Sequence, residues 1–137
     1  MKRAPILWFV ALVLGAFLSS CGGDDQPRLE IRNLMFAPAL TTSFEPGDTL
    51  AVSATLVADQ GIRNVRLLLE PQEGDAFSWK FDGLFLYENP PRTSLVFDKL
   101  VDISETAEPG EYLFTIILTD RSGEQVTQER ELTLEAP

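Results

Sequence analysis

Residues 111–120, EYLFTIILTD, decide the fold class of this chain. The large apolar side chains of this stretch recur at every second position, namely Tyr112, Phe114, Ile116 and Leu118. A repeat of two is typical of a β-strand with one buried face, because successive side chains of a strand point to opposite faces. The stretch therefore predicts a long strand whose Tyr112 face packs in a core.

The same repeat of two continues through most of the chain after residue 29. It is present in residues 50–56 and 65–69, and it returns in residues 126–134 with polar interruptions. Turn signals rich in Pro, Gly and Asp separate these runs, at residues 46–48, 59–61, 109–110 and 120–123. About seven short strands with turns at this spacing predict an all-β fold. We expect a single immunoglobulin-like antiparallel β-sandwich over residues 29–135.

Tyr112 directly follows a tight turn that contains Pro109 and Gly110. This is the place of the tyrosine corner in immunoglobulin-like sandwiches, where the ring packs in the core and the hydroxyl binds an upstream backbone group. Antibody domains carry their second cysteine two residues later, and this chain has Phe114 there. We therefore expect a structural role for Tyr112 and apolar packing in place of a disulfide bridge.

The first twenty residues have the order of parts found in a secretory signal. Lys2 and Arg3 are followed by an apolar run over residues 6–18 and then by small residues. The run is shorter than the roughly 20 apolar residues that a helix needs to cross a bilayer. We expect residues 1–20 to be a signal peptide and the mature chain to be exported.

Leu18-Ser19-Ser20-Cys21 resembles the lipobox of bacterial lipoproteins. The resemblance implies a diacylglycerol on the Cys21 thiol, cleavage before Cys21 and acylation of the new amino group. The other interpretation is an ordinary secreted protein whose cysteine happens to fall here. We expect a lipid-anchored chain, with the acylated Cys21 and a polar tether over residues 21–28. More than one acyl chain is needed for lasting attachment to a membrane.

The tether carries Asp24 and Asp25, which resemble the acidic surface-export signal of Bacteroidetes lipoproteins. A solvated spacer explains the same residues. Gly22, by analogy with other lipoproteins, argues against retention in the inner membrane. We expect an outer-membrane lipoprotein, and the sequence leaves open whether it faces the periplasm or the cell surface.

The composition excludes several classes of chemistry. The chain has no histidine and a single cysteine, so it offers neither a Ser-His-Asp or Cys-His catalytic group nor an imidazole or sulfur metal site. One cysteine also excludes a disulfide within the chain. The formal net charge of −10 repels phosphate backbones and anionic lipid headgroups, so we expect no nucleic-acid partner. No cofactor is expected.

Carboxylates are the remaining candidates for chemistry. Asp59, Asp98, Asp102 and Asp120 are conceivable calcium ligands, but they lack the spacing of a calcium-binding loop, and a solvated surface explains them equally well. A glycosidase needs two carboxylates held across a deep cleft. A small sandwich with short loops leaves little room for one, so we expect no metal site and no enzymatic activity.

Residues 77–87, FSWKFDGLFLY, are the least generic part of the chain. Asp82-Gly83 predicts a two-residue hairpin turn. Such a hairpin directs one face toward the core and leaves Lys80, Phe85 and Tyr87 on the opposite face. The core face would carry Trp79, Phe81, Leu84 and Leu86. An exposed pair of rings beside a lysine could bind a sugar or a partner side chain. In the alternative, a loop or neighbouring strand covers the rings. Our candidate binding residues are Trp79, Lys80, Phe85 and Tyr87.

The chain as a whole resembles the small immunoglobulin-like lipoproteins of Bacteroidetes that are classed as a domain of unknown function. The resemblance depends on the lipobox, residues 47–50 and 59–62, Trp79, and residues 110–112 and 119–123. It implies a fold and a location but no activity. We therefore predict a non-catalytic binding module at the outer membrane or cell surface, with a protein or glycan partner. The alternative is a structural envelope lipoprotein that acts as a spacer without a specific ligand.

Overall fold

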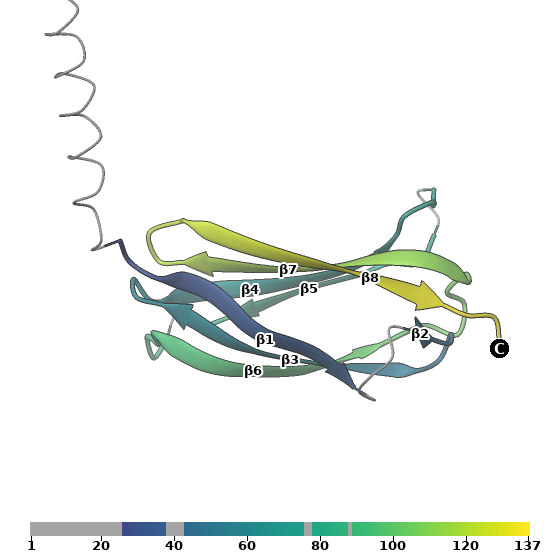
Figure 1. Ribbon diagram of the computed structural model, residues 1–137, viewed down its shortest axis with the longest axis horizontal. Helices are drawn as coiled ribbons and strands as arrows, with labels where there is room; N and C mark the ends of the chain where they lie inside the picture. Colours follow the sequence, from purple (N-terminus) through teal and green to yellow (C-terminus); the bar gives the residue numbers. More distant parts are fainter. Residues whose placement is uncertain (1–25, 38–42, 76–77, 88) are drawn as a thin grey trace, which may run out of the picture.

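The computed structural model describes residues 26–37, 43–75, 78–87 and 89–137, and these form a two-layered β-sandwich (Figure 1). Its strands are β1 (Leu29–Ala37), β2 (Ser43–Phe44), β3 (Thr49–Ala58), β4 (Ile62–Pro71), β5 (Phe81–Leu86), β6 (Ser94–Asp102), β7 (Gly110–Asp120) and β8 (Gln125–Leu134). The predicted all-β sandwich is confirmed. The alternating runs correspond to β3, β4, β7 and β8, whereas β1, β2 and β6 were not among them; β2, with two residues, is too short to show a period.

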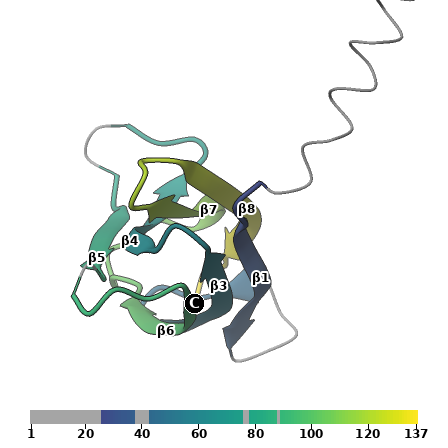
Figure 2. The same ribbon diagram turned by 90° about the vertical axis from the view of Figure 1, so that its left-hand side faces the viewer.

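The strands form two sheets that face each other (Figure 2). One sheet has the order β1-β3-β6 and the other has the order β2-β8-β7-β4-β5. Neighbouring strands are antiparallel, except that β2 runs parallel to β8. The predicted signal peptide, Cys21 and the first half of the tether lie outside the described residues. Within the described ranges, no helix is long and apolar enough to cross a membrane.

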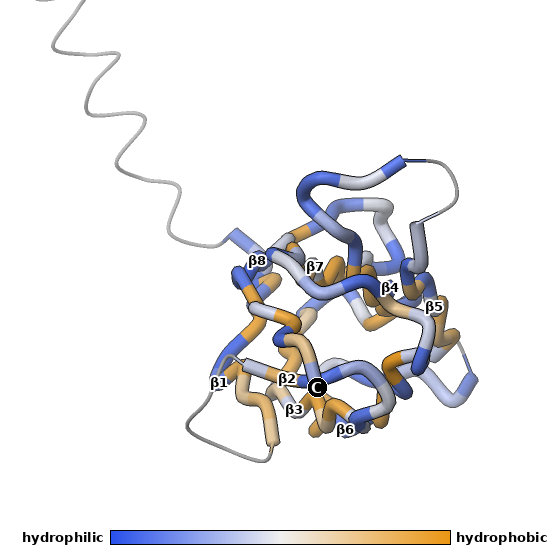
Figure 3. The backbone as a smooth tube through the Cα atoms, turned by 90° about the vertical axis from the view of Figure 1, so that its right-hand side faces the viewer, coloured by the Kyte–Doolittle hydropathy of each residue, from blue (hydrophilic) through white to orange (hydrophobic). Residues whose placement is uncertain are grey.

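The core lies between the sheets and is built from the faces that the repeat of two predicted. Side chains of β3, β4 and β7 alternate between buried and more exposed positions, and the inward members include Val52, Val65 and Ile116. Burying an aliphatic or aromatic side chain of this size contributes about 1.5–3 kcal/mol. Figure 3 shows the two layers from the C-terminal end, with hydrophilic positions gathered in the loop between β4 and β5.

Tyr112 forms the predicted corner. Its ring is buried, and its hydroxyl donates a hydrogen bond of 2.8 Å to the backbone oxygen of Glu108. Burial of the ring raises the pKa of the Tyr112 hydroxyl. Phe114, at the place of the second cysteine of antibody domains, is also buried and packs edge-on against Phe36, with ring centroids 4.9 Å apart. Apolar packing thus replaces the bridge.

The two long sides of the sandwich are closed differently. On the β1 and β8 side, the Gln128 side-chain nitrogen donates a hydrogen bond of 2.7 Å to the backbone oxygen of Ile31. On the β5 and β6 side, the rings of Phe85 and Tyr87 pack edge-on against Phe97, at centroid distances of 5.6 and 6.5 Å. Aromatic side chains therefore fill the gap between these two edge strands.

Residues 77–87 do not form the predicted hairpin. Residues 81–86 are a single strand, β5, in which Asp82 lies opposite Leu68 and Gly83 opposite Leu67 of β4. The interpretation of Asp82-Gly83 as a turn is therefore wrong. The rings of Phe81 and Phe85 cover Gly83, where a Cβ atom would lie 2.9 Å from Phe81 Cζ and 3.4 Å from Phe85 Cε2. The glycine makes room for two rings and does not reverse the chain.

Candidate functional site

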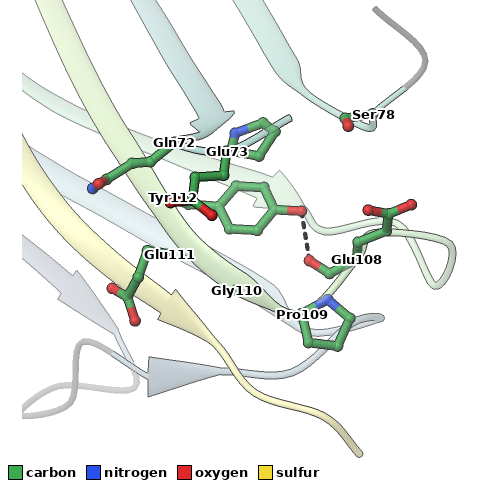
Figure 4. A pocket seen from close by; sticks show the side chains of 9 residues that line it. Gln72, Glu73, Ser78, Glu108, Pro109, Gly110, Glu111 and Tyr112 are labelled. Carbon is green, nitrogen blue, oxygen red and sulfur yellow. Dashed lines mark hydrogen bonds between the residues drawn. The ribbon is translucent and has the colours of Figure 1, made fainter. Parts of the chain in front are cut away.

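A hollow lined by polar and charged side chains lies at the C-terminal end of the sandwich, away from the tether. Figure 4 shows it from close by. It has a volume of about 350 Å³ and lies between the end of β4, the loop that follows it, and the turn into β7. It is lined by Pro71, Gln72, Glu73, Ser78, Glu108, Pro109, Gly110, Glu111 and Tyr112. We call this hollow the acidic groove.

Short hydrogen bonds hold the walls of the acidic groove. The backbone nitrogen of Gln72 donates to Glu111 O at 2.9 Å, so the β4–β7 pairing continues past the end of β4. In the loop between β4 and β5, Asp75 N donates to Ser78 Oγ at 3.0 Å and Ser78 N donates to Asp75 O at 3.2 Å. The opposite wall is fixed by the hydrogen bond that the Tyr112 hydroxyl donates to the backbone oxygen of Glu108. Each flanking loop is therefore held by hydrogen bonds among its own residues, and the groove lies between the two loops.

Carboxylates dominate the groove and the surface around it. Glu73, Glu108 and Glu111 line the groove, and Thr133 Oγ1 donates to the Glu111 carboxylate at 3.0 Å. A second hollow of about 430 Å³ beside it is lined by Glu73, Gly74, Asp75, Ser78 and Glu108. A third, of about 490 Å³ on the outer face of the sheet, is lined by Glu70, Pro71, Gln72, Leu113, Glu129 and Glu131. The arrangement favours a cationic partner through the carboxylates' combined field.

Trp79 closes the core directly below the acidic groove. Its ring lies against the ring of Tyr112, with centroids 6.3 Å apart. The space left between Trp79, Tyr112, Leu69 and Ile103 amounts to about 10 Å³. Such a space is at the lower limit for one water molecule. Trp79 therefore fills core as predicted, and it contacts a residue that lines the groove.

The other predicted binding residues are not arranged as the hairpin required. Phe85 and Tyr87 are half-buried and face the interior, where their rings pack against Phe97, so they do not form the exposed platform that the hairpin predicted. Leu84 and Leu86, predicted to face the core, are 57% and 68% exposed. Trp79 and Phe81 keep the inward face that was predicted for them. Because β5 continues straight through Gly83, the residues after the glycine lie on the face opposite to the predicted one.

Lys80 is exposed, but another lysine lies over the Phe85 ring. The Nζ atom of Lys99, on β6, lies 5.1 Å from the centroid of that ring. The sequence missed this contact because it joins two strands that are not neighbours in either sheet. The sequence analysis likewise missed the acidic groove, whose walls come from segments at least thirty residues apart in the chain. The acidic residues of both walls can be read from the sequence, but their proximity in the fold cannot.

The family model of DUF4625, described as a domain of unknown function, matches residues 19–135. The chain belongs to this family. The predicted resemblance to a domain of unknown function is thereby confirmed at the level of the family. No curated protein matches the DUF4625 chain in sequence.

Several solved structures share the fold of this DUF4625 domain. Wild-type OgpA from Akkermansia muciniphila is 12% identical, with a TM-score of 0.59, over 82% of this chain and 29% of that chain. Catalytically inactive OgpA in complex with an O-glycopeptide substrate is 14% identical, with a TM-score of 0.57, over 82% and 30%. The sporulation control protein Spo0M from Bacillus subtilis is 11% identical, with a TM-score of 0.50, over 80% and 50%.

These likenesses concern the fold alone at such low identity. The DUF4625 chain spans less than a third of the length of the OgpA chains and half the length of Spo0M. The sandwich is therefore a unit that larger proteins also contain.

The four aspartates considered as calcium ligands do not meet. Asp59 binds Arg28, whose backbone nitrogen donates to it at 2.9 Å, and this bond lowers the pKa of the Asp59 carboxyl. Asp102 lies at the opposite end of the sandwich and accepts the Thr49 hydroxyl at 3.0 Å. Asp120 is buried in the turn between β7 and β8. Among the residues that the structure describes, no group of three or more acids is placed to hold a metal ion.

Proposed function

We propose that this chain is a lipid-anchored binding module of the bacterial envelope, without catalytic activity, that binds its partner at the acidic groove. The observation that carries the proposal is the position of the groove: it lies at the end of the sandwich opposite the tether, and hydrogen bonds fix both of its walls. A site so placed is open to a partner while the other end is held at a membrane.

The partner that the groove favours is a protein with a basic segment. Glu73, Glu108 and Glu111 present carboxylates on both walls, and cationic side chains form the stronger, charge-assisted hydrogen bonds with carboxylates. The groove lies on the surface beside a second hollow that shares Glu73, Ser78 and Glu108 with it, and this continuity suits an extended peptide. A glycan is the second ligand class in the test below, and a spacer without a ligand is the outcome if neither binds.

Binding at the groove can be measured by the fluorescence of Trp79. This residue is the tryptophan that remains after residues 1–20 are removed, and its ring contacts Tyr112 in the groove wall. We expect an arginine-rich peptide to change the fluorescence of Trp79 saturably, with a response that weakens as salt is added. Envelope glycan fragments serve as the second probe. No saturable response to either probe from a folded protein would favour the spacer.

Two matched variants connect the response to the groove. We expect Glu73→Gln/Glu108→Gln to lose most of the peptide response. Asp98→Asn/Glu124→Gln makes the same change in formal charge at exposed positions away from the groove, and it should bind like the unmodified chain. Equal binding by both double variants would assign the peptide to another surface and would sink the groove assignment.

The anchor has its own test. We expect Cys21→Ala to abolish membrane association without unfolding the sandwich, because Cys21 precedes the first strand. Metabolic labelling with a fatty acid tests the chemistry, and equal label in the variant would refute it. Protease treatment of intact cells then separates a surface-exposed protein from one that faces the periplasm.

A further inference from the structure

The tether enters the sandwich at an end that gathers arginines from separate segments. Leu29 pairs with Ala58, so the start of β1 lies beside the turn between β3 and β4 (Figures 1 and 2). The turn between β7 and β8 lies at the same end, because Ile62 pairs with Asp120. The arginines gathered here are Arg28, Arg63, Arg92 and Arg121. We call this surface the arginine end.

Hydrogen bonds hold three of these arginines on one surface, two of them through the backbone and Arg63 through its side chain. Ile62 N donates to Arg92 O at 2.7 Å, and Arg121 N donates to Gly61 O at 2.9 Å. The Arg63 guanidinium donates to Arg121 O at 3.0 Å. Gly61 has a φ of +93°, and a Cβ atom there would lie 2.7 Å from Arg121 Cδ, so the stem of Arg121 lies over the glycine. Arg92 and Arg121 remain exposed.

The carboxylates of the arginine end are mostly engaged within the domain. Asp59 forms an ion pair with Arg28 at 3.3 Å. Asp120 is 2% exposed, and its Oδ1 accepts hydrogen bonds from Ser122 N, Ser122 Oγ and Glu124 N at 2.9, 2.6 and 3.0 Å. Glu124 itself is exposed. The exposed arginines therefore meet little competing negative charge from the described residues around them.

The opposite end of the sandwich is strongly acidic. Exposed carboxylates there include Glu73, Asp75, Glu105, Glu108, Glu111 and Glu135. Most acidic residues of the described ranges thus lie outside the arginine end, while Asp24 and Asp25 belong to the tether. The sequence-based expectation that the surface repels anionic headgroups took no account of this distribution, because strand direction sorts the charges between the two ends.

We infer that the arginine end docks on the anionic phospholipid headgroups of the membrane that holds the anchor, so that the sandwich stands upright. The inference rests on the proposed lipid at Cys21 and extends it. Arg92 and Arg121 attract the headgroups within about 10 Å at 0.1 M salt, while the acidic end is repelled. The upright position directs the acidic groove away from the bilayer.

Trp79 also tests this orientation, since it lies at the acidic end. The processed lipoprotein, purified from membranes, is placed in vesicles of phosphatidylcholine alone or with phosphatidylglycerol, each carrying a dansyl-labelled lipid. We expect weaker energy transfer from Trp79 to the dansyl groups in the anionic vesicles. Arg92→Glu/Arg121→Glu should raise the transfer to the level seen in phosphatidylcholine, and so should high salt.

Two controls separate local charge from net charge. Arg92→Lys/Arg121→Lys keeps the charge and should behave like the unmodified protein. Arg32→Glu/Arg130→Glu makes the same change in formal charge on the middle of the sandwich and should leave the weak transfer unchanged. Equal transfer in both lipids would overturn the orientation while the anchor stands. A protein that floats with neither vesicle would overturn the anchor and, with it, this inference.

Discussion

The two ends of the sandwich are built in different ways. At the arginine end, short turns are tied to one another by backbone hydrogen bonds, such as Ala58 N to Thr93 O at 2.8 Å and Asp59 N to Arg28 O at 2.9 Å. The acidic end also has such a bond, from Gln72 N to Glu111 O, but the loops beyond it are held by side chains, above all by the Tyr112 hydroxyl, and hollows remain between them. Apart from Asp120, whose carboxylate holds the β7–β8 turn, side chains at the arginine end can change without loss of the backbone bonds between its turns, whereas loops held by side chains can change shape when the sequence changes.

This difference teaches how one small domain can keep one end constant and let the other vary. The arginine end keeps a fixed surface next to residues 26–28, and the acidic end can vary its groove without disturbing the strands; in the function proposed above, the first end serves attachment and the second serves binding. Functional residues are disproportionately found on such loops, positioned by a rigid scaffold. The predictions below test whether the two ends are as independent as their hydrogen bonds indicate.

The largest effect is expected at the arginine end. Asp120→Ala should destabilise the domain by about 2–3 kcal/mol. The substitution removes a buried carboxylate, and the donors from Ser122 and Glu124 are left without their acceptor. Asp120→Asn keeps an oxygen acceptor and should cost less. Urea denaturation gives both values. A loss for Asp120→Ala smaller than that for Tyr112→Phe would show that the turn does not hold this end.

A smaller loss is expected at the acidic end. Tyr112→Phe removes the hydroxyl bond to Glu108 and keeps the ring, so we expect a destabilisation of about 1–2 kcal/mol. The alkaline range provides a second measurement. Burial raises the Tyr112 pKa in the fold, so its contribution is complete below the unfolded pKa of about 10 and is lost as the pH rises above it. An unchanged urea midpoint for Tyr112→Phe would contradict a stabilising role for this hydroxyl bond.

Acidification should weaken the ion pair at the tether. Hydrogen bonds from Arg28 lower the Asp59 pKa in the fold. The contribution of this pair is therefore present above the unfolded pKa of about 3.9 and is lost as the pH falls through the lowered, folded value. The urea midpoint of the unmodified chain should fall more steeply below about pH 4 than that of Asp59→Asn. Parallel curves would mean that the pair contributes nothing.

The smallest effect on stability is expected in the groove itself. Glu73→Gln/Glu108→Gln should change the free energy of unfolding by no more than about 0.5 kcal/mol, since both side chains are exposed. The same double variant is expected to lose peptide binding. A large loss of stability would show that the groove carboxylates serve the fold, and the separation between the two ends would fail.

The sequence predicted the parts of the molecule where local pattern and tertiary packing agree. The inward faces of β3, β4 and β7 follow a strict repeat of two, and Tyr112 follows its turn directly. Residues 77–87 were misread because Asp82-Gly83 has the local signature of a turn. Pairing with β4 determined the outcome: the Arg66 guanidinium donates to Asp82 at 2.6 Å, and two rings lie over Gly83.

The site was less predictable than the fold. Both walls of the acidic groove and all four members of the arginine end come from distant segments, and only the directions of the strands bring them together. The count of charged residues predicted that the surface is acidic overall. It did not predict that arginines gather at one end of the sandwich and carboxylates at the other. An alternating sequence pattern predicts which face of a strand is buried. It does not predict which turns lie at the same end of the sandwich.

Phe114 in place of a bridging cysteine has a consequence for how the protein is made. Because the core is closed by aromatic packing and the chain's single cysteine precedes the first strand, folding consumes no oxidant. The sandwich can reach its final structure in a reducing or an oxidising compartment alike. Dithiothreitol should therefore leave its melting temperature unchanged.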